Sequence, residues 1–128
     1  MNFIEASFEP LKNTGQIKIH SAADFEGMRV AGRLAAEALD MITEFVVEGV
    51  STAELDKRIQ DYLEGAGAVS ATIGYRGYQH ASCISLNEVV CHGIPSDNTR
   101  LEDKDILNID VTVIVDGWHG DTSRMYVV

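Results

Sequence analysis

Apolar positions recur at helical spacing through the first half of the chain. From Met28 to Phe45 an apolar side chain returns every three or four residues, and charged side chains occupy the opposite face. Ser21 and Asp24 have the spacing of a capping box, which satisfies the first free N–H groups of a helix. The pattern therefore predicts a helix that opens at Ser21 and stops at Gly49.

A second, shorter helix is predicted directly after the first. Ser51 and Glu54 repeat the capping-box spacing. The apolar stripe that follows ends near Gly65 or Gly67, where glycine favours a helix terminus.

The rest of the chain has the pattern of strands and turns. Candidate strands are bounded by turn residues and rich in β-branched side chains: 69–73, 82–86, 88–91, 106–115 and 118–127. Two helices followed by a run of strands predict an α+β fold with a mostly antiparallel sheet.

Length and composition are those of one globular domain. The 128 residues are 45% apolar and 23% charged, which excludes disordered and collagen-like chains. Pro10 and Gly15 interrupt any pattern in residues 1–20, so we expect an irregular N-terminal arm there and a single folded unit over residues 21–128.

The charge balance excludes several partners. Lys and Arg number 10 against 20 Asp and Glu, which gives a net charge of −10. Such a field repels phosphate groups, so we expect no nucleic acid and no membrane partner. The sequence shows neither a membrane span nor a signal peptide, and its two cysteines are too few for a disulfide scaffold. These features predict a reduced, cytoplasmic protein.

The strongest candidate for chemistry is the pair of strands around Asp116-Gly117. This dipeptide between two strand patterns is a typical two-residue hairpin turn, and it would pair Thr112 with Asp121. Because side chains alternate along a strand, Asp110 shares the face of Thr112. Asp110 and Asp121 are therefore predicted to be diagonal neighbours on one face of the sheet.

Two facing carboxylates have two interpretations. They repel unless they are protonated or bridged by a cation, and a site for two metal ions would use both. Alternatively, they are solvated side chains on the exposed face of an antiparallel sheet. His119 lies on the same face and could chelate a cation together with Asp121, but it lies beside the turn, where an exposed side chain is expected.

Two loops add further candidates. His92 lies between Cys91 and Gly93 where the backbone turns, a usual setting for a functional side chain, although a structural histidine fits as well. No second Cys/His pair has zinc-finger spacing. Tyr75 and Tyr78 lie in a glycine-rich loop and either line an apolar pocket or cover the sheet.

Together these motifs resemble the bacterial type I methionine aminopeptidases, over about residues 23–128. The resemblance is carried by GMRVAGRLAAE at 27–37, GYRGY at 74–78, CISLNEVVCHGIP at 83–95, NIDVT at 108–112 and DGWHGDTS at 116–123. It implies a pita-bread fold, in which two related α+β halves hold a two-metal site between them. This chain resembles the N-terminal half.

The resemblance also implies roles for individual residues. Asp110 and Asp121 match two metal ligands, and His92 matches the catalytic histidine that contacts substrate near the scissile amide. Tyr75, Tyr78 and Cys83 match the substrate-binding pocket for the methionine side chain. Thr72 stands where a cysteine is common and Gln79 where a proline is common.

The implied function is metal-dependent removal of the initiator methionine from nascent polypeptides whose second residue is small. The cofactors would be two divalent ions (Co, Mn, Fe, Zn or Ni), with one His and two Glu ligands supplied by a C-terminal half that this chain does not match. The alternatives are a truncated, non-catalytic pita-bread module that binds peptide N-termini or a partner chain, and a related dipeptidase or proline-specific peptidase.

Overall fold

The computed structural model describes residues 2–5 and 15–128. The elements are, in chain order, β1 (Asn2–Glu5), β2 (Gln16–Ile19), α1 (Ala22–Ile42), η1 (Thr43–Phe45), α2 (Thr52–Gly65), β3 (Val69–Ser70), η2 (Tyr75–Gly77), β4 (Ser82–Leu86), β5 (Ile106–Val115) and β6 (Trp118–Val127). No helix in the described part of the chain is long and apolar enough to cross a membrane.

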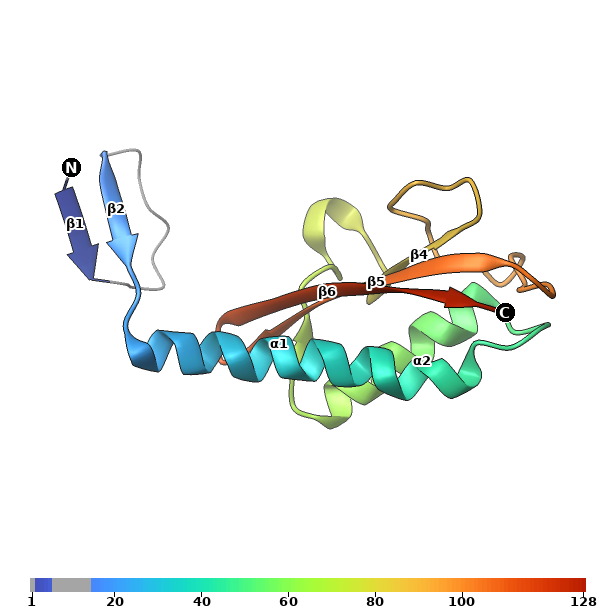
Figure 1. Ribbon diagram of the computed structural model, residues 1–128, viewed down its shortest axis with the longest axis horizontal. Coiled ribbons are helices and arrows are strands. Elements are labelled where there is room, and N and C mark those ends of the chain that lie inside the picture. Colours follow the sequence, from blue (N-terminus) through green and yellow to red (C-terminus); the bar gives the residue numbers. More distant parts are fainter. Residues whose placement is uncertain (1, 6–14) are drawn as a thin grey trace.

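β5 is the central strand of the main sheet. β6 pairs with it along its whole length, and β3 and β4 pair with successive stretches of its other edge, all antiparallel. α1 packs against β5 and β6, and α2 against β3 and β4, so that both helices lie on one side of the sheet (Figure 1). The predicted α+β class is confirmed.

The core lies between this sheet and the two helices. Side chains at alternate positions of β5 are fully buried: Leu107, Ile109, Val111 and Val113. They meet the apolar faces of α1 and α2, including Leu39, Ile42, Leu55, Ile59 and Leu63. Burial of each such side chain contributes about 1.5–3 kcal/mol. The intervening residues of β5 point to the other face, which neither α1 nor α2 covers.

Both helices begin where the sequence predicts. The Ser21 N–H donates to the Asp24 carboxylate at 2.7 Å, and the Asp24 N–H donates to Ser21 Oγ at 3.3 Å, which completes the first capping box. In the second, the Glu54 N–H donates to Ser51 Oγ at 3.1 Å. The Glu54 carboxylate pairs instead with Arg58 at 3.0 Å, so only half of the second box forms.

The first helix ends earlier than the predicted stop at Gly49. α1 ends at Ile42 and passes into the 3₁₀ turn η1, and Gly49 lies in a later turn with a left-handed φ of 87°. The Thr43 hydroxyl donates to the Leu39 carbonyl at 2.9 Å, which satisfies one of the last carbonyls of the helix.

Two predicted strands need correction. The stretch 69–73 forms a strand only at Val69–Ser70, because the chain then turns at Gly74, which has a left-handed φ of 87°. The stretch 88–91 is not a strand. β4 ends at Leu86, before a left-handed Asn87, and the following loop folds back along β4.

The prediction of an irregular arm over residues 1–20 is wrong in part. β1 and β2 form a separate parallel pair, from Asn2 opposite Gln16 to Glu5 opposite Ile19. Pro10 falls in the sequence between the two strands and Gly15 directly precedes the second, so neither interrupts a strand. Residues 1 and 6–14 lie outside the described residues.

Candidate functional site

The hairpin that was predicted from Asp116-Gly117 is confirmed. Asp116 and Gly117 have left-handed φ values of 49° and 83°, which is the backbone of a type I′ turn. Thr112 lies opposite Asp121 as expected, and Asp110 lies opposite Ser123. The two carboxylates are therefore diagonal neighbours on the face that the helices leave open.

The two carboxylates interact electrostatically. Burial raises the pKa of Asp110 above its ordinary value, and the charge of Asp121 and a hydrogen bond with that side chain raise this pKa further. The nearby His92 lowers the same pKa. Two carboxylates that are diagonal neighbours repel each other unless a proton or a cation relieves the repulsion.

Close contact with α1 fixes the position of the hairpin. Gly120 lies directly against the backbone of α1, where a Cβ atom would overlap the carbonyl group of Ala31. A Cβ on Gly27 would overlap the Trp118 ring in the same way. These glycines let the helix and β6 approach closely, and Asp121 follows Gly120 on the opposite face.

A loop carries His92 onto this open face. The Ile84 N–H donates to the Gly93 carbonyl at 2.8 Å, and the Gly93 N–H donates to Ser85 Oγ at 3.0 Å, so the loop is bound to β4. A Cβ on Gly93 would overlap the Ile84 carbonyl. His92 itself is exposed, with a left-handed φ of 56°, and acts electrostatically on Asp110.

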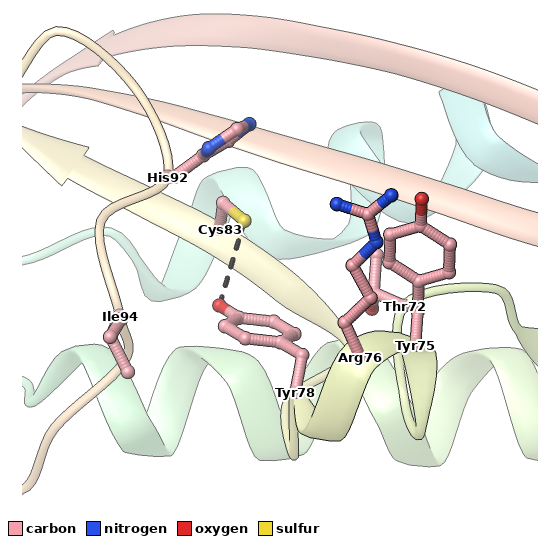
Figure 2. A pocket seen from close by; sticks show the side chains of 7 residues that line it. All are labelled: Thr72, Tyr75, Arg76, Tyr78, Cys83, His92 and Ile94. Carbon is pink, nitrogen blue, oxygen red and sulfur yellow. Dashed lines mark hydrogen bonds between the residues drawn. The ribbon is translucent and has the colours of Figure 1, made fainter.

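Beside His92 is a pocket of about 430 Å³. It is lined by Thr72, Tyr75, Arg76, Tyr78, Cys83, His92 and Ile94 (Figure 2). Cys83 lies opposite Asp110 in the sheet, so the pocket adjoins the carboxylates. All four residues that were predicted to bind substrate line this one cavity.

Hydrogen bonds hold the aromatic wall of the pocket. The Tyr78 hydroxyl donates to the Ser82 carbonyl at 2.7 Å and accepts from Cys83 Sγ at 3.5 Å, a contact drawn in Figure 2. Burial, and then the interaction with Cys83, raises the pKa of Tyr78 well above its ordinary value. Tyr78 therefore presents a neutral phenol ring to the pocket at physiological pH.

Sequence reasoning missed two of the residues that line the pocket. Arg76 has a left-handed φ of 49° inside η2, and its guanidinium lies 5.4 Å from the centre of the Tyr75 ring. Its place between two tyrosines and two glycines was the available signal. Ile94 directly follows the His92-Gly93 pair, but nothing in its spacing indicated a role.

The donors on the open face fit divalent cations in part. Carboxylate oxygens are ligands that hard divalent cations prefer, and the charge of Asp121, which after burial is the second cause of the raised pKa of Asp110, would also attract a cation to the pair. However, no cluster of three or more His, Cys, Asp or Glu side chains suited to a metal occurs within residues 15–128. Asp110 and Asp121 therefore offer two carboxylates, which are fewer side chains than a complete set of metal ligands.

Comparison with known proteins identifies relatives that are longer than this chain. It is 60% identical over 113 residues to the methionine aminopeptidase of Escherichia coli K12, which covers 88% of the chain and 43% of that protein. It is 52% identical over 112 residues to the enzyme of Rickettsia prowazekii, with the same coverage. The chain thus spans less than half the length of these relatives.

Solved structures identify relatives of the same kind. The methionine aminopeptidase from Rickettsia prowazekii superposes with a TM-score of 0.84, at 52% identity over 86% of this chain and 44% of that one. The enzyme from Thermotoga maritima gives 0.81, at 30% identity over 84% and 43%. A prolidase from Pyrococcus furiosus, 21% identical, shares the fold with a TM-score of 0.73 over 88% and 35%.

Residues 26–128 match the profile of metallopeptidase family M24, a family whose activity depends on divalent metal ions. The structural relatives have the pita-bread fold that the sequence motifs implied. This chain therefore belongs to metallopeptidase family M24.

Proposed function

We propose that this chain provides the methionine pocket and two of the metal ligands of a methionine aminopeptidase. The observation that supports this most strongly is that Asp110, Asp121, His92 and the pocket all lie on the open face of the sheet. The reaction would be removal of the first methionine from nascent polypeptides whose second residue is small. From this activity we also infer a cytoplasmic location.

The pocket suits a methionine side chain. Tyr75 and Tyr78 offer aromatic surface to an unbranched thioether, an interaction that contributes about 0.3–1.5 kcal/mol per contact. A peptide held here would place its first amide bond toward His92 and the carboxylates.

Each polar residue has a proposed task. Asp110 and Asp121 would hold divalent ions, which supply Lewis-acid chemistry at a peptide carbonyl when they are bound. His92, which is exposed at the pocket mouth, would donate a hydrogen bond to the substrate near the scissile amide and so orient it. The ions would be Co, Mn, Fe, Zn or Ni.

We further propose that the ligand set is completed by a C-terminal half like that of the longer relatives. In support, the open face carries exposed apolar side chains beside the carboxylates: Ile106, Met125 and Val127. An exposed apolar face of this kind favours association with another folded surface. The 128-residue chain by itself should then bind divalent metal weakly and release no methionine.

Metal binding tests the assignment of the carboxylates. Mn²⁺ should bind the chain together with the second half of the Escherichia coli enzyme, supplied as a separate polypeptide, and the mixture should release methionine from Met-Ala-Ser. Asp110→Asn and Asp121→Asn should each weaken Mn²⁺ binding at least 100-fold, because each removes a charged ligand, whereas removal of a group that only supports a ligand costs about 10–100-fold. The matched control is Asp116→Asn, which removes the same charge from the turn of the same hairpin. Equal metal affinity in Asp110→Asn and Asp116→Asn would refute the metal site.

The task of His92 is tested separately. In the reconstituted protein His92→Ala should lower turnover about 100-fold, because a substrate that loses this hydrogen bond is no longer aligned for the reaction. Mn²⁺ affinity should stay within about twofold because His92 is not proposed as a ligand. Loss of metal on this substitution would make His92 a ligand and contradict the proposed role. Full turnover by the 128-residue chain without a second half would contradict the half-site.

A further inference from the structure

A buried carboxylate on α2 lies behind the pocket and has no part in the chemistry described so far. Asp56 is 5% exposed, yet it has no lysine or arginine partner among the ion pairs of residues 15–128. One of its oxygens accepts two hydrogen bonds from Ser82, from the backbone N–H at 2.8 Å and from Oγ at 2.6 Å. Its other oxygen lies 3.2 Å from His80 Nδ1. All these contacts join α2 to one short segment, residues 80–82.

Three residues that line the pocket contact or adjoin residues 80–82. Tyr78 donates to the Ser82 carbonyl at 2.7 Å, and its ring packs edge-on against His80, with ring centres 5.5 Å apart. Thr72 Oγ1 donates to the His80 carbonyl at 2.6 Å. Cys83 follows Ser82 and donates to Tyr78. Thus Thr72, Tyr78 and Cys83 all depend on where residues 80–82 lie.

The reason for these contacts lies in the edge of the sheet. β4 pairs with β5 on one side, and its other edge leaves backbone N–H groups without strand partners. The Ser82 N–H is satisfied by Asp56, and the Ile84 N–H by the Gly93 carbonyl in the loop that carries His92. The two edge contacts therefore anchor opposite sides of the same pocket.

We propose that Asp56 is a positioning residue for the methionine pocket. Through Ser82 and His80 it holds Tyr78, Thr72 and Cys83 in the geometry that fits the substrate side chain. This inference rests on the proposed function for the identity of that side chain. The positioning itself concerns only this chain's own contacts and is tested without any catalysis.

The first experiment uses the two cysteines of the 128-residue chain. Cys91 is exposed and Cys83 is half-buried against Tyr78, so iodoacetamide labelling followed by mass spectrometry gives the rate at Cys83 relative to an internal reference. Asp56→Ala should raise the Cys83-to-Cys91 ratio about tenfold, because loss of buried hydrogen bonds lets the wall open. Asp56→Asn keeps an acceptor for Ser82, so its labelling ratio should lie between those of the unsubstituted chain and Asp56→Ala. The matched control is Asp61→Asn, on the same helix but exposed, which should leave the ratio unchanged.

The second experiment measures Met-Ala-Ser cleavage in the reconstituted protein. Asp56→Ala should raise KM about tenfold and change kcat less than twofold, because a loosened wall weakens substrate binding and not the reacting groups. Asp56→Asn should restore part of the lost affinity. A role in stability alone would reduce the amount of folded protein, and hence apparent kcat, at constant KM.

Ser82→Ala keeps the tests decisive if Asp56→Ala does not fold. It removes only the hydroxyl contact and should raise both the labelling ratio and KM about threefold. An unchanged labelling ratio in a folded variant would overturn the positioning role. If the unsubstituted protein cleaves no methionine peptide, the proposed function fails, and the labelling ratio alone decides whether Asp56 positions the pocket.

Discussion

The β5–β6 hairpin and the wall of the pocket reach the same open face by different physical routes. In the hairpin, one turn and the alternation of side chains along two strands place Asp110 beside Asp121. In the pocket wall, Tyr75, Tyr78 and His92 lie on irregular backbone that is held by contacts far apart in the sequence, such as Asp56 with Ser82. The comparison teaches that local pairing can set the geometry of the two proposed metal ligands, whereas the proposed substrate pocket depends on tertiary contacts.

The largest expected effect concerns the contact of the hairpin with α1. Gly120→Ala should reduce the free energy of unfolding of the chain by about 3 kcal/mol, because the new methyl group would overlap the Ala31 carbonyl in a closely packed interface. Gly32→Ala is the control: it lies in the interior of α1 with no neighbour within 4 Å and should stabilise the chain by about 0.5–1 kcal/mol. Urea unfolding followed by circular dichroism measures both. A loss below about 1 kcal/mol for Gly120→Ala would show that the interface adapts.

The corresponding change in the pocket should act locally. Gly93→Ala should displace the His92 loop from β4, because a Cβ there would overlap the Ile84 carbonyl. The unfolding free energy should fall by only about 1 kcal/mol, since an exposed loop can open without the core. Hydrogen exchange at the Ile84 N–H, which is bonded to Gly93, should become faster. Gly65→Ala, at the end of α2 with open space around it, should leave exchange at the Ile84 N–H unchanged and should not lower the unfolding free energy. If Gly93→Ala destabilised the chain as much as Gly120→Ala, the distinction between the two regions would fail.

The burial of Asp110 and the repulsion between its carboxylate and that of Asp121 predict a dependence of stability on pH. The pKa of Asp110 is raised in the folded chain, so the native state keeps this proton to higher pH than the unfolded chain does. The associated stability is present below the ordinary value of 3.8 and is lost as pH rises through the raised pKa. At pH 7 Asp110→Asn should therefore stabilise the metal-free chain, by about 0.5 kcal/mol after allowance for solvent screening.

The measurement is urea unfolding of the two proteins at pH 7 and near pH 4. The advantage of Asp110→Asn should shrink at the lower pH. With Mn²⁺ and the second half present at pH 7, the unsubstituted chain should instead be the more stable of the two proteins. Of the two, only the unsubstituted chain keeps both proposed ligands. A variant that is less stable than the original at pH 7 without metal would show that the carboxylates do not repel.

The smallest effect is expected at the turn. Asp116→Asn should change the unfolding free energy by less than about 0.5 kcal/mol, because Asn-Gly suits a type I′ turn as well as Asp-Gly does. Both turn residues already have left-handed φ values. The same urea titration measures it. A larger loss would mean that the Asp116 carboxylate has a specific contact and that the hairpin depends on more than its backbone.

The accuracy of the sequence predictions follows the same division. The bounds of β4, β5 and β6, the turn and the opening of both helices agree with the structure, because each depends on neighbours a few residues away. The errors fall where longer-range contacts decide. The stretch 88–91 has strand-like residues, but the hydrogen bonds of Gly93 to β4 hold that part of the chain as a loop. The pairing of β1 with β2 was likewise missed, because its two strands are separated by a segment with breakers.

The sequence by itself determined the α+β class, the hairpin register and the shared face of Asp110 and Asp121. Alternation along a strand is a geometric property of the backbone, so these follow from spacing alone. The motifs also pointed to Tyr75, Tyr78, Cys83 and His92, but only the tertiary structure gathered them around one cavity. It also decided the place of Arg76 and the role we assign to Asp56. The physical reason is that the pocket depends on close approach at Gly93 and on satisfying the edge of β4, and both require partners that are remote in sequence.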